Sequence, residues 1–408
     1  MPIAKQIELD LEKASYVRKM FEQGEELKQL YGPENIYDFS LGNPEIEPPD
    51  SVRDAFVRHA GDGGLGNHRY MNNAGYMHVR ERIADMIGLQ SGIPMKPTHI
   101  VMTVGAAGGM NIALKTLLNP GDEVIAFAPY FKEYDFYAKN HGGSIVPVPV
   151  DGVAFKPVPA ALEAAVTAKT KAVIINSPNN PSGAVYDCDC LQGVADVLRA
   201  CENKFGTDIY VIADEPYMSI IYDGLVAPHV FKYFKNAIII NSYSKSLALA
   251  GERIGYVAVN PEATGAGSGA SVDVGAGSGV DKIVAGLVFC NRVLGYVNAP
   301  AFLQRVVADN LDTSVDIAVY TEKRDAICSI MRDAGFDFMT PQGAFYLFPK
   351  ILGDDEEAFK DRAVAHNILI VPGTGFGWPG RFRLAFCVAT DTILRSRGAF
   401  MKLASEYS

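Results

Sequence analysis

The sequence predicts an α/β protein whose larger part is a mostly parallel seven-stranded sheet covered by helices. Between residues 99 and 260, short apolar runs alternate with longer segments of helical period. Most of these runs are continuously apolar rather than alternating, which is what burial of a strand on both faces demands. The predicted strands are 99–104, 123–128, 145–150, 172–176, 209–213, 237–241 and 255–259.

One of these strands is predicted at an edge of the sheet. The run 145–150 contains Pro147 and Pro149, and proline lacks the N–H group that a central strand donates to its neighbour. In sheets of this kind, ligands bind beyond the carboxyl ends of the strands. The motifs that follow the strands between residues 105 and 245 are therefore expected along a single edge.

A smaller α+β domain is predicted from both ends of the chain. Apolar residues recur at helical spacing between residues 15 and 30, and 309–334 is predicted as a long helix. Segments 345–348, 368–371 and 381–386 are predicted as strands. We expect residues 1–48 to join the small domain, 49–300 to form the large domain and 301–408 to form the small C-terminal domain.

A segment of low complexity interrupts this pattern. Residues 263–280 consist almost entirely of Gly, Ser, Ala and Val. Such side chains offer little volume to bury, so we expect a mobile loop.

Composition indicates an ordinary globular protein. The 408 residues are 48% apolar and 21% charged, and no window approaches the ~20 apolar residues needed to cross a bilayer. The formal charge of −10 argues against nonspecific binding to nucleic acid or to an anionic membrane. The N-terminus lacks the basic and apolar segments of a signal peptide. We therefore expect a soluble, cytoplasmic protein without a membrane or nucleic-acid partner.

No metal site is predicted. The six cysteines include no C-x2-C pair, and Cys188 and Cys190 have no second pair of Cys or His near them. The seven histidines show no H-E-x-x-H spacing. Free thiols in a reducing compartment are the expectation.

The most informative segment is 241–256. It places Lys245 just beyond the apolar run 237–240, with Ser242 and Ser244 before it and Arg253 eight residues after it. This arrangement presents one amine at the end of a buried strand, among groups suited to a phosphate. Ser and Lys are common, so the pattern alone proves little. It resembles the cofactor lysine of the fold-type I enzymes that use pyridoxal 5′-phosphate (PLP), the aspartate aminotransferase-like class I/II aminotransferase family.

A phosphate site is predicted where the strand 99–104 turns into a helix. Backbone N–H groups and the positive helix end converge there, and the small residues Gly105, Ala106 and Ala107 permit a close approach. Taken alone, such a turn more often serves tight helix packing. Relatives often place a hydroxyl in this turn. Since these three residues carry no hydroxyl, we expect Ser242, Ser244 and Arg253 to supply more of the phosphate binding.

The pattern Y-x4-G-x4-R beginning at Tyr70 matches a further family region. Its tyrosine reaches the phosphate of the neighbouring subunit in the family, so the resemblance implies a homodimer in which Tyr70 crosses the interface. By itself, Tyr70 would more often be an aromatic residue of a loop.

Three further motifs match residues around the PLP ring. Asp214 ends a predicted strand and matches the aspartate that pairs with the protonated ring nitrogen. Tyr217 and Asn180 match the residues that contact the ring oxygen O3′. Phe131 matches the aromatic residue on the ring face, and Tyr130 is the competing choice. Individually, these motifs also suit a turn, a capped strand end or a core aromatic.

Candidate substrate-binding residues lie near both ends of the chain. Arg383 matches the arginine that binds the α-carboxylate through two parallel hydrogen bonds, and Arg381, two residues before it, is the rival. Gly42, in L-G-N-P, fits the segment that closes over the substrate. Arg292 lies in the region where dicarboxylate-specific relatives carry an arginine, although a surface helix charge is the favoured interpretation. The resemblance spans roughly residues 35–390.

The resemblance implies a PLP-dependent aminotransferase that moves an amino group between an L-amino acid and a 2-oxo acid, plausibly 2-oxoglutarate. Lys245 forms a Schiff base with PLP and, once displaced, moves the substrate proton. Burial near Arg253 and a cationic ring should lower the pKa of Lys245.

Three other functions would each require or retain particular sequence features. A C-S β-lyase of the same fold would keep all the cofactor residues and remains the alternative. A PLP-binding regulator would need a DNA-binding segment, for which the stretch before Gly42 is too short. A nicotinamide-dependent enzyme would need the spacing G-x-G-x-x-G, which 104–109 lacks.

Overall fold

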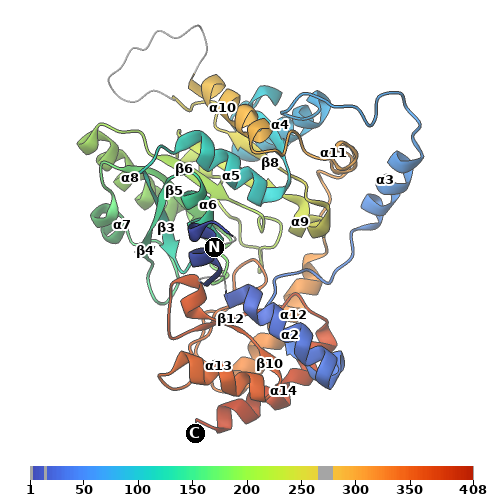
Figure 1. Cartoon of the computed structure of the whole chain (residues 1–408), viewed down its shortest axis with the longest axis vertical. Coiled ribbons are helices and arrows are strands. Elements are labelled where there is room, and N and C mark those ends of the chain that lie inside the picture. Colours follow the sequence, from blue (N-terminus) through green and yellow to red (C-terminus); the bar gives the residue numbers. More distant parts are fainter. Residues whose placement is uncertain (1–2, 13–15, 265–278, 408) are drawn as a thin grey trace.

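The computed structural model describes residues 3–12, 16–264 and 279–407, and the seven predicted strands form one sheet in it (Figure 1). The strand order is β2-β8-β7-β6-β5-β3-β4, in which β8 runs antiparallel to both of its neighbours and the other pairs are parallel. This confirms the predicted fold class. The strands are β2 (Ile100–Thr103), β3 (Glu123–Ala128), β4 (Ser144–Pro149), β5 (Thr170–Asn176), β6 (Tyr210–Asp214), β7 (Ala237–Ser242) and β8 (Gly255–Val259).

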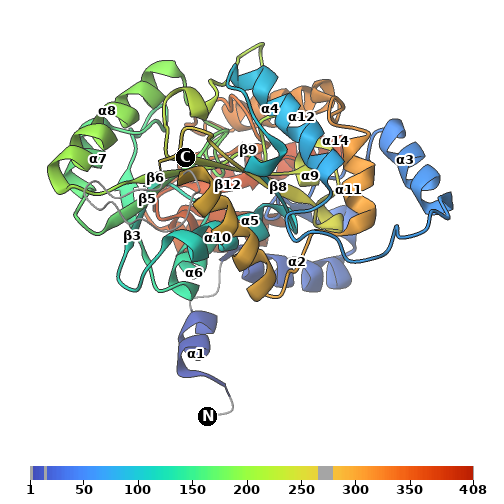
Figure 2. The same ribbon diagram turned by 90° about the horizontal axis from the view of Figure 1, so that it is seen from above.

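Helices cover both faces of this sheet (Figure 2). In β7, Ile238 and Ile240 pack on the side of α5 and α10, whereas Ala237 and Ile239 pack on the side of α4 and α8. Both faces of the strand are therefore buried, which explains its unbroken apolarity. The helices of this part are α3 (Asp50–Gly61), α4 (Met77–Ser91), α5 (Gly105–Leu117), α6 (Glu133–Asn140), α7 (Pro159–Ala165), α8 (Cys188–Phe205), α9 (Tyr243–Ser246), α10 (Gly279–Val293) and α11 (Ala301–Ala308).

The edge position of β4 is also confirmed. This strand pairs only with β3, and it carries Pro147 and Pro149. No ladder hydrogen bond is lost on its open side.

The second part of the structure joins the two ends of the chain. β1 (Tyr37–Asp38) pairs in parallel with β10 (Ile368–Leu369), and β11 (Val371–Pro372), β12 (Phe382–Ala385) and β9 (Tyr346–Leu347) form an antiparallel sheet. A separate core contains Phe39, Phe345 and Phe400. The domain boundaries at 48/49 and 300/301 stay predictions. The helices are α2 (Tyr16–Tyr31), α12 (Ile317–Asp333), α13 (Glu356–Ala365) and α14 (Thr390–Ser405). The remaining helix, α1 (Lys5–Glu12), lies beside α6 of the large part, where Lys139 Nζ donates to Asp10 Oδ1 at 2.5 Å (Figure 2).

Two predicted elements of this part need correction. The helix expected over 309–334 begins only at Ile317, because the side chain of Asp316 caps it by accepting a hydrogen bond from Ala318 N at 2.9 Å. Residues 309–316 instead link α11 to α12, and Val315 N donates to Ser246 O at 2.8 Å. The strand expected over 368–371 is two short strands, β10 and β11, which pair with different partners.

Other predictions have mixed outcomes. The helix predicted over 15–30 is confirmed as α2, whereas α1 was not predicted. Of the Gly/Ser segment 263–280, residues 265–278 lie outside the described residues. The six cysteines are free. No helix among the described residues is long and apolar enough to span a bilayer.

Candidate active site

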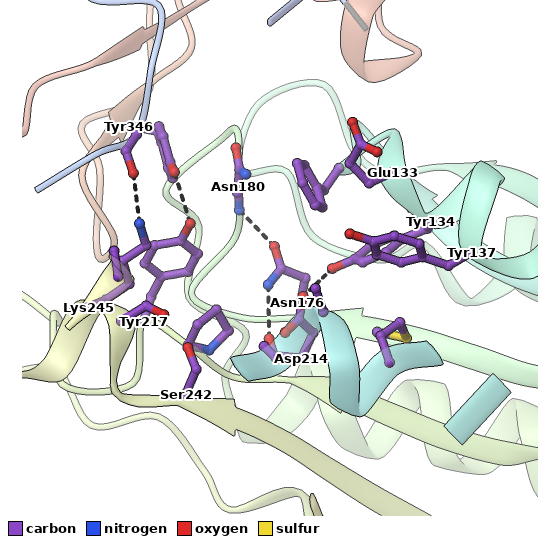
Figure 3. Close-up of a pocket in the computed structure, with 18 of the residues that line it drawn as sticks. Glu133, Tyr134, Tyr137, Asn176, Asn180, Asp214, Tyr217, Ser242, Lys245 and Tyr346 are labelled. Atoms are coloured by element: carbon purple, nitrogen blue, oxygen red, sulfur yellow. Dashed lines mark hydrogen bonds between the residues drawn. The ribbon is translucent and has the colours of Figure 1, made fainter. Parts of the chain in front are cut away.

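The carboxyl ends of β5, β6 and β7 meet at a cavity of about 600 Å³ (Figure 3). The start of α5 and one face of α6 form further walls, and Tyr346 and Arg383 enter from the small sheet. Most of the predicted site residues line this cavity. They are Gly42, Ala106, Ala107, Phe131, Asn180, Asp214, Tyr217, Ser242, Ser244, Lys245, Arg253 and Arg383.

Lys245 lies in α9, the short helix directly after β7. Its Nζ atom donates a hydrogen bond to Gly42 O at 2.7 Å (Figure 3) and lies 5.3 Å from the centre of the Phe345 ring. Burial lowers the pKa of this amine from 10.5 to about 8, and the charges of Arg253 and Arg383 act in the same direction. About a tenth of the amine is thus deprotonated at pH 7, far more than for an ordinary lysine, which suits a nucleophile or base.

The predicted phosphate end is formed by the first turn of α5. The N–H groups of that turn have no acceptor within the helix, and together they form its positive end. Gly105 has a φ of 76°, and a Cβ atom there would lie 2.5 Å from Nη2 of Arg253. Glycine is therefore required both for the backbone conformation and for the close approach of the guanidinium. Gly105 itself does not line the cavity.

Asp214 ends β6 at the floor of the cavity. Its Oδ2 atom accepts a hydrogen bond from the Tyr134 hydroxyl at 2.5 Å, whereas Oδ1 is shielded from solvent and has no hydrogen-bond partner among the described residues. Burial raises the pKa of Asp214 from 3.8 to about 6, and the bond from Tyr134 opposes that rise. A carboxylate held in this way favours a cationic or protonated ligand group beside Oδ1.

Asn176 connects Asp214 to Asn180. Its Nδ2 atom donates to Asp214 O at 2.9 Å, and its Oδ1 atom accepts from Asn180 N at 2.8 Å (Figure 3). The loop that carries Asn180 is thus fixed to the end of β6.

Arg383 lies on β12 with its guanidinium between the rings of Tyr346 and Phe376, 4.7 and 4.8 Å from their centres. Nη1 donates to Asn180 Oδ1 at 3.1 Å and Nη2 to Ser40 O at 2.5 Å, while Nε is buried without a partner among the described residues. The rival Arg381 does not line the cavity, because it donates to the backbone oxygens of Phe348 and Gly152 at 3.0 and 3.1 Å.

The structure also separates Phe131 from its competitor. Phe131 lines the cavity and packs edge-on against Tyr134, with 5.7 Å between the ring centres. Tyr130 is buried outside the lining, and its hydroxyl donates to Asp135 at 2.8 Å. Phe131 is therefore the aromatic residue available to a planar ligand.

Two predicted candidates lie away from this cavity. Tyr70 is 89% exposed, in the loop between α3 and α4 that extends from the body of the molecule (Figure 1). Arg292 is on α10 in a separate hollow that Asn73 and Arg80 also line. Its guanidinium carbon lies 5.5 Å from the centre of the Phe289 ring.

Sequence reasoning missed five polar lining residues: Glu133, Tyr134, Tyr137, Asn176 and Tyr346. Tyr134 stands one helical turn after Phe131, so it shares a face with that residue. Asn176 is a polar residue at the end of a buried strand. Both signals were available. Tyr346 ends the segment 343–346 (G-A-F-Y), which resembles a family signature but by itself gives this tyrosine no role.

Three comparisons with known proteins all find aminotransferases. The model of the aminotransferase class I and II family matches residues 34–396. An aspartate aminotransferase of Thermotoga maritima is 29% identical over 396 residues, 96% of this chain and 94% of the relative. An aromatic-amino-acid aminotransferase 2 of Thermococcus litoralis is 28% identical over 415 residues, 98% of this chain and 97% of the relative.

Solved structures extend this likeness to the whole fold. The crystal structure of an amino transferase from Eubacterium rectale has a TM-score of 0.93 at 36% identity, with 100% of both chains covered. That of an aspartate aminotransferase from Thermus thermophilus with maleate has a TM-score of 0.84 at 22% identity, covering 99% of this chain and 100% of that one. The second shows a shared fold only.

Proposed function

Since the chain belongs to the aminotransferase class I and II family and is an aminotransferase, we propose that Lys245 holds PLP through a Schiff base in the cavity described above. The enzyme would move an amino group between an L-amino acid and a 2-oxo acid, with 2-oxoglutarate as an acceptor. The single observation that carries this proposal is the pairing of Lys245, whose pKa is about 8, with Asp214, whose pKa is about 6, in one cavity.

The residues present fit each polar group of PLP. The first turn of α5 together with Ser242, Ser244 and Arg253 suits the phosphate. The partnerless Oδ1 atom of Asp214 suits a protonated ring nitrogen. A cation there would offset the cost of burying the carboxylate and would lower its pKa again.

The remaining contacts would set the orientation of the ring. Tyr217 and Asn180 would contact O3′, and Phe131 would lie on the ring face. When bound, PLP supplies an electron sink that stabilises negative charge at the substrate's Cα atom.

The protein's own residues would perform the other steps. Arg383 would bind the α-carboxylate through two parallel hydrogen bonds, replacing its present bonds to Ser40 O and Asn180. Lys245 would accept the Cα proton at Nζ and return it, since an amine with a pKa of about 8 is both a usable base and a usable acid near neutral pH. Gly42, beside Lys245, would exclude water from that side.

A homodimer is part of this proposal. Tyr70 is 89% exposed and does not line the cavity of its own chain. It could therefore contact a PLP phosphate only in the cavity of a second copy. A dilution series followed by activity and sedimentation tests this. A fully active monomer would contradict the role of Tyr70 across the interface.

Reconstitution tests the proposed function directly. Purified protein incubated with PLP should develop a visible absorption band, and a screen of L-amino acids with 2-oxoglutarate should yield glutamate. Protein that stays colourless would overturn the proposal. Release of pyruvate from cystathionine without an acceptor would instead favour the C-S β-lyase.

A further inference from the structure

Tyr346 connects three parts of the cavity that the proposed function treats separately. Its hydroxyl lies 2.9 Å from the hydroxyl of Tyr217 (Figure 3), and its ring lies against the Arg383 guanidinium at 4.7 Å. A Cβ atom on Gly42 would lie 2.1 Å from the same hydroxyl, so the backbone of Gly42 packs directly on it. The side chain of Tyr346 is 2% exposed.

The two hydroxyls share one hydrogen bond, and its direction matters. If Tyr346 donates, the hydrogen of Tyr217 is free to point into the cavity. If Tyr217 donates, that hydrogen is used between the two rings. Only the first arrangement lets Tyr217 serve a ligand oxygen.

The surroundings favour Tyr346 as the donor. Burial raises the pKa of Tyr346 to about 12, against which the neighbouring Arg383 charge acts. Burial also raises the pKa of Tyr217 well above 10. The Arg383 guanidinium lies 4.7 Å from the centre of the Tyr346 ring, and this cation makes the Tyr346 hydroxyl the more acidic of the two. The hydroxyl with the lower pKa is the better donor of the pair.

We propose that Tyr346 is a positioning residue that donates its hydroxyl hydrogen to Tyr217, and thereby directs the hydrogen of Tyr217 toward O3′ of PLP. Through its contacts with Arg383 and Gly42, it links this hydrogen bond to the carboxylate-binding side of the cavity. This inference rests on the proposed function and adds a residue to it.

The direction of the expected effect follows from O3′. A hydrogen bond from Tyr217 stabilises negative charge on O3′, which makes the nitrogen that joins Lys245 to PLP less basic. Without Tyr346, Tyr217 becomes a weaker donor, so that nitrogen becomes more basic. The pH midpoint of the visible absorption should therefore rise.

The first test titrates the visible absorption of the PLP-reconstituted protein against pH. Tyr346→Phe should raise the midpoint by about 0.5–1 pH unit, because a buried hydrogen bond contributes roughly 1 kcal/mol. Tyr217→Phe should raise it more. The matched control is Tyr222→Phe, which removes a buried hydroxyl that donates to Ala344 O at 2.5 Å outside the cavity, and it should leave the midpoint unchanged.

An unchanged or lowered midpoint in Tyr346→Phe would overturn the inference, as would an equal rise in Tyr222→Phe. These outcomes are distinct from failure of the proposed function, in which wild-type protein would develop no visible band.

The second test concerns the link to Gly42. Gly42→Ala forces a methyl group against the Tyr346 hydroxyl, so it should raise the KM for the amino acid about tenfold or more. In a Tyr346→Phe background that atom is gone, and the added penalty should be several-fold smaller. Additive penalties would contradict the link, since the two sites would then act independently.

Discussion

The two walls of the cavity are built from differently connected parts of the chain. The sheet wall takes its polar groups from the ends of β5, β6 and β7, whose register is fixed by backbone ladders. The opposite wall unites Gly42, Tyr346 and Arg383, which are far apart in the sequence. They are held by the β9–β12 pairing and by single bonds such as that from Arg383 to Ser40 O.

This difference separates two kinds of function. Polar groups at the ends of hydrogen-bonded strands are preorganised. Charges and dipoles fixed in this way suit the chemical step and the binding of a permanently held ligand. On the opposite wall the ladders of β12 fix the backbone, but the Arg383 guanidinium is held by two single hydrogen bonds that a ligand could replace, which favours a substrate that comes and goes. We therefore expect substitutions in the sheet wall to change rate and PLP binding, and substitutions in the opposite wall to change KM.

The largest effect is expected at Lys245. Lys245→Ala removes both the group that holds PLP and the base, so the rate of amino transfer should fall by at least ~10⁴-fold. Steady-state and single-turnover assays with a visible-absorption readout measure this. Lys235→Ala is a suitable control, since its side chain is 75% exposed on the surface, and it should retain full activity. A Lys245 variant within tenfold of wild type would break the assignment of chemistry to the sheet wall.

Asp214→Asn should lower the rate by about 10²–10³-fold, because the ring nitrogen loses its charged partner. The same change should stabilise the protein without PLP. Burial raises the pKa of Asp214 from 3.8 to about 6. The stability that follows from this shift is present below pH ~4 and is lost as the pH rises through about 6.

At about 1.4 kcal/mol per pKa unit, the gain for Asp214→Asn reaches up to about 3 kcal/mol at pH 8 and is smaller at pH 5. Urea denaturation of the PLP-free protein at both pH values measures it. A variant less stable than wild type at pH 8 would show that Asp214 stabilises the empty sheet wall rather than straining it.

On the opposite wall, Arg383→Lys should raise the KM for amino acids by about 10–100-fold and change kcat less. A lysine offers no planar fork for two parallel hydrogen bonds. Arg381→Lys is the matched comparison, because that guanidinium binds two backbone oxygens outside the cavity, and its KM should stay near the wild-type value. If Arg383→Lys lowered kcat and left KM unchanged, the assignment of substrate binding to the opposite wall would be wrong.

The same division explains how much could be predicted from the sequence. Strand ends are local features, so Lys245, Asp214 and Asn180 could be predicted to share one edge, and the structure brings them together. The alternation of side chains along a strand could not decide between Arg381 and Arg383, because it places both on the same face. That rule holds only within β12, which begins at Phe382, and Arg381 lies before it.

The hydrogen bonds of Tyr134 and Tyr346 could not be predicted for a similar reason, although the position of Tyr134 beside Phe131 could. The contact of Tyr134 with Asp214 depends on how α6 lies over the sheet, and that of Tyr346 with Tyr217 depends on how the small sheet packs on the large one. Neither arrangement is encoded in the spacing of nearby residues. Register and packing decide them, and these follow from the whole core.

The smallest effect, expected at Tyr134, sharpens the account of the sheet wall. Its hydroxyl donates to Asp214 Oδ2 at 2.5 Å and lowers the pKa of that carboxyl. Tyr134→Phe should therefore raise that pKa further above about 6. More of the carboxyl is then protonated at pH 7, and the Kd for PLP should rise by about 5–10-fold, the equivalent of one hydrogen bond of ~1 kcal/mol.

The pH dependence tells this electrostatic role of Tyr134 from a packing role. The loss of affinity should shrink toward pH 9, where Asp214 is ionised with or without the tyrosine hydroxyl. Tyr137→Phe, on the same helix and also lining the cavity, serves for comparison, because Tyr137 has no hydrogen bond to Asp214 among the described residues. A Kd ratio for Tyr134→Phe that stays constant from pH 6 to pH 9 would assign the hydroxyl to packing, and the sheet wall would then hold Asp214 through its backbone alone.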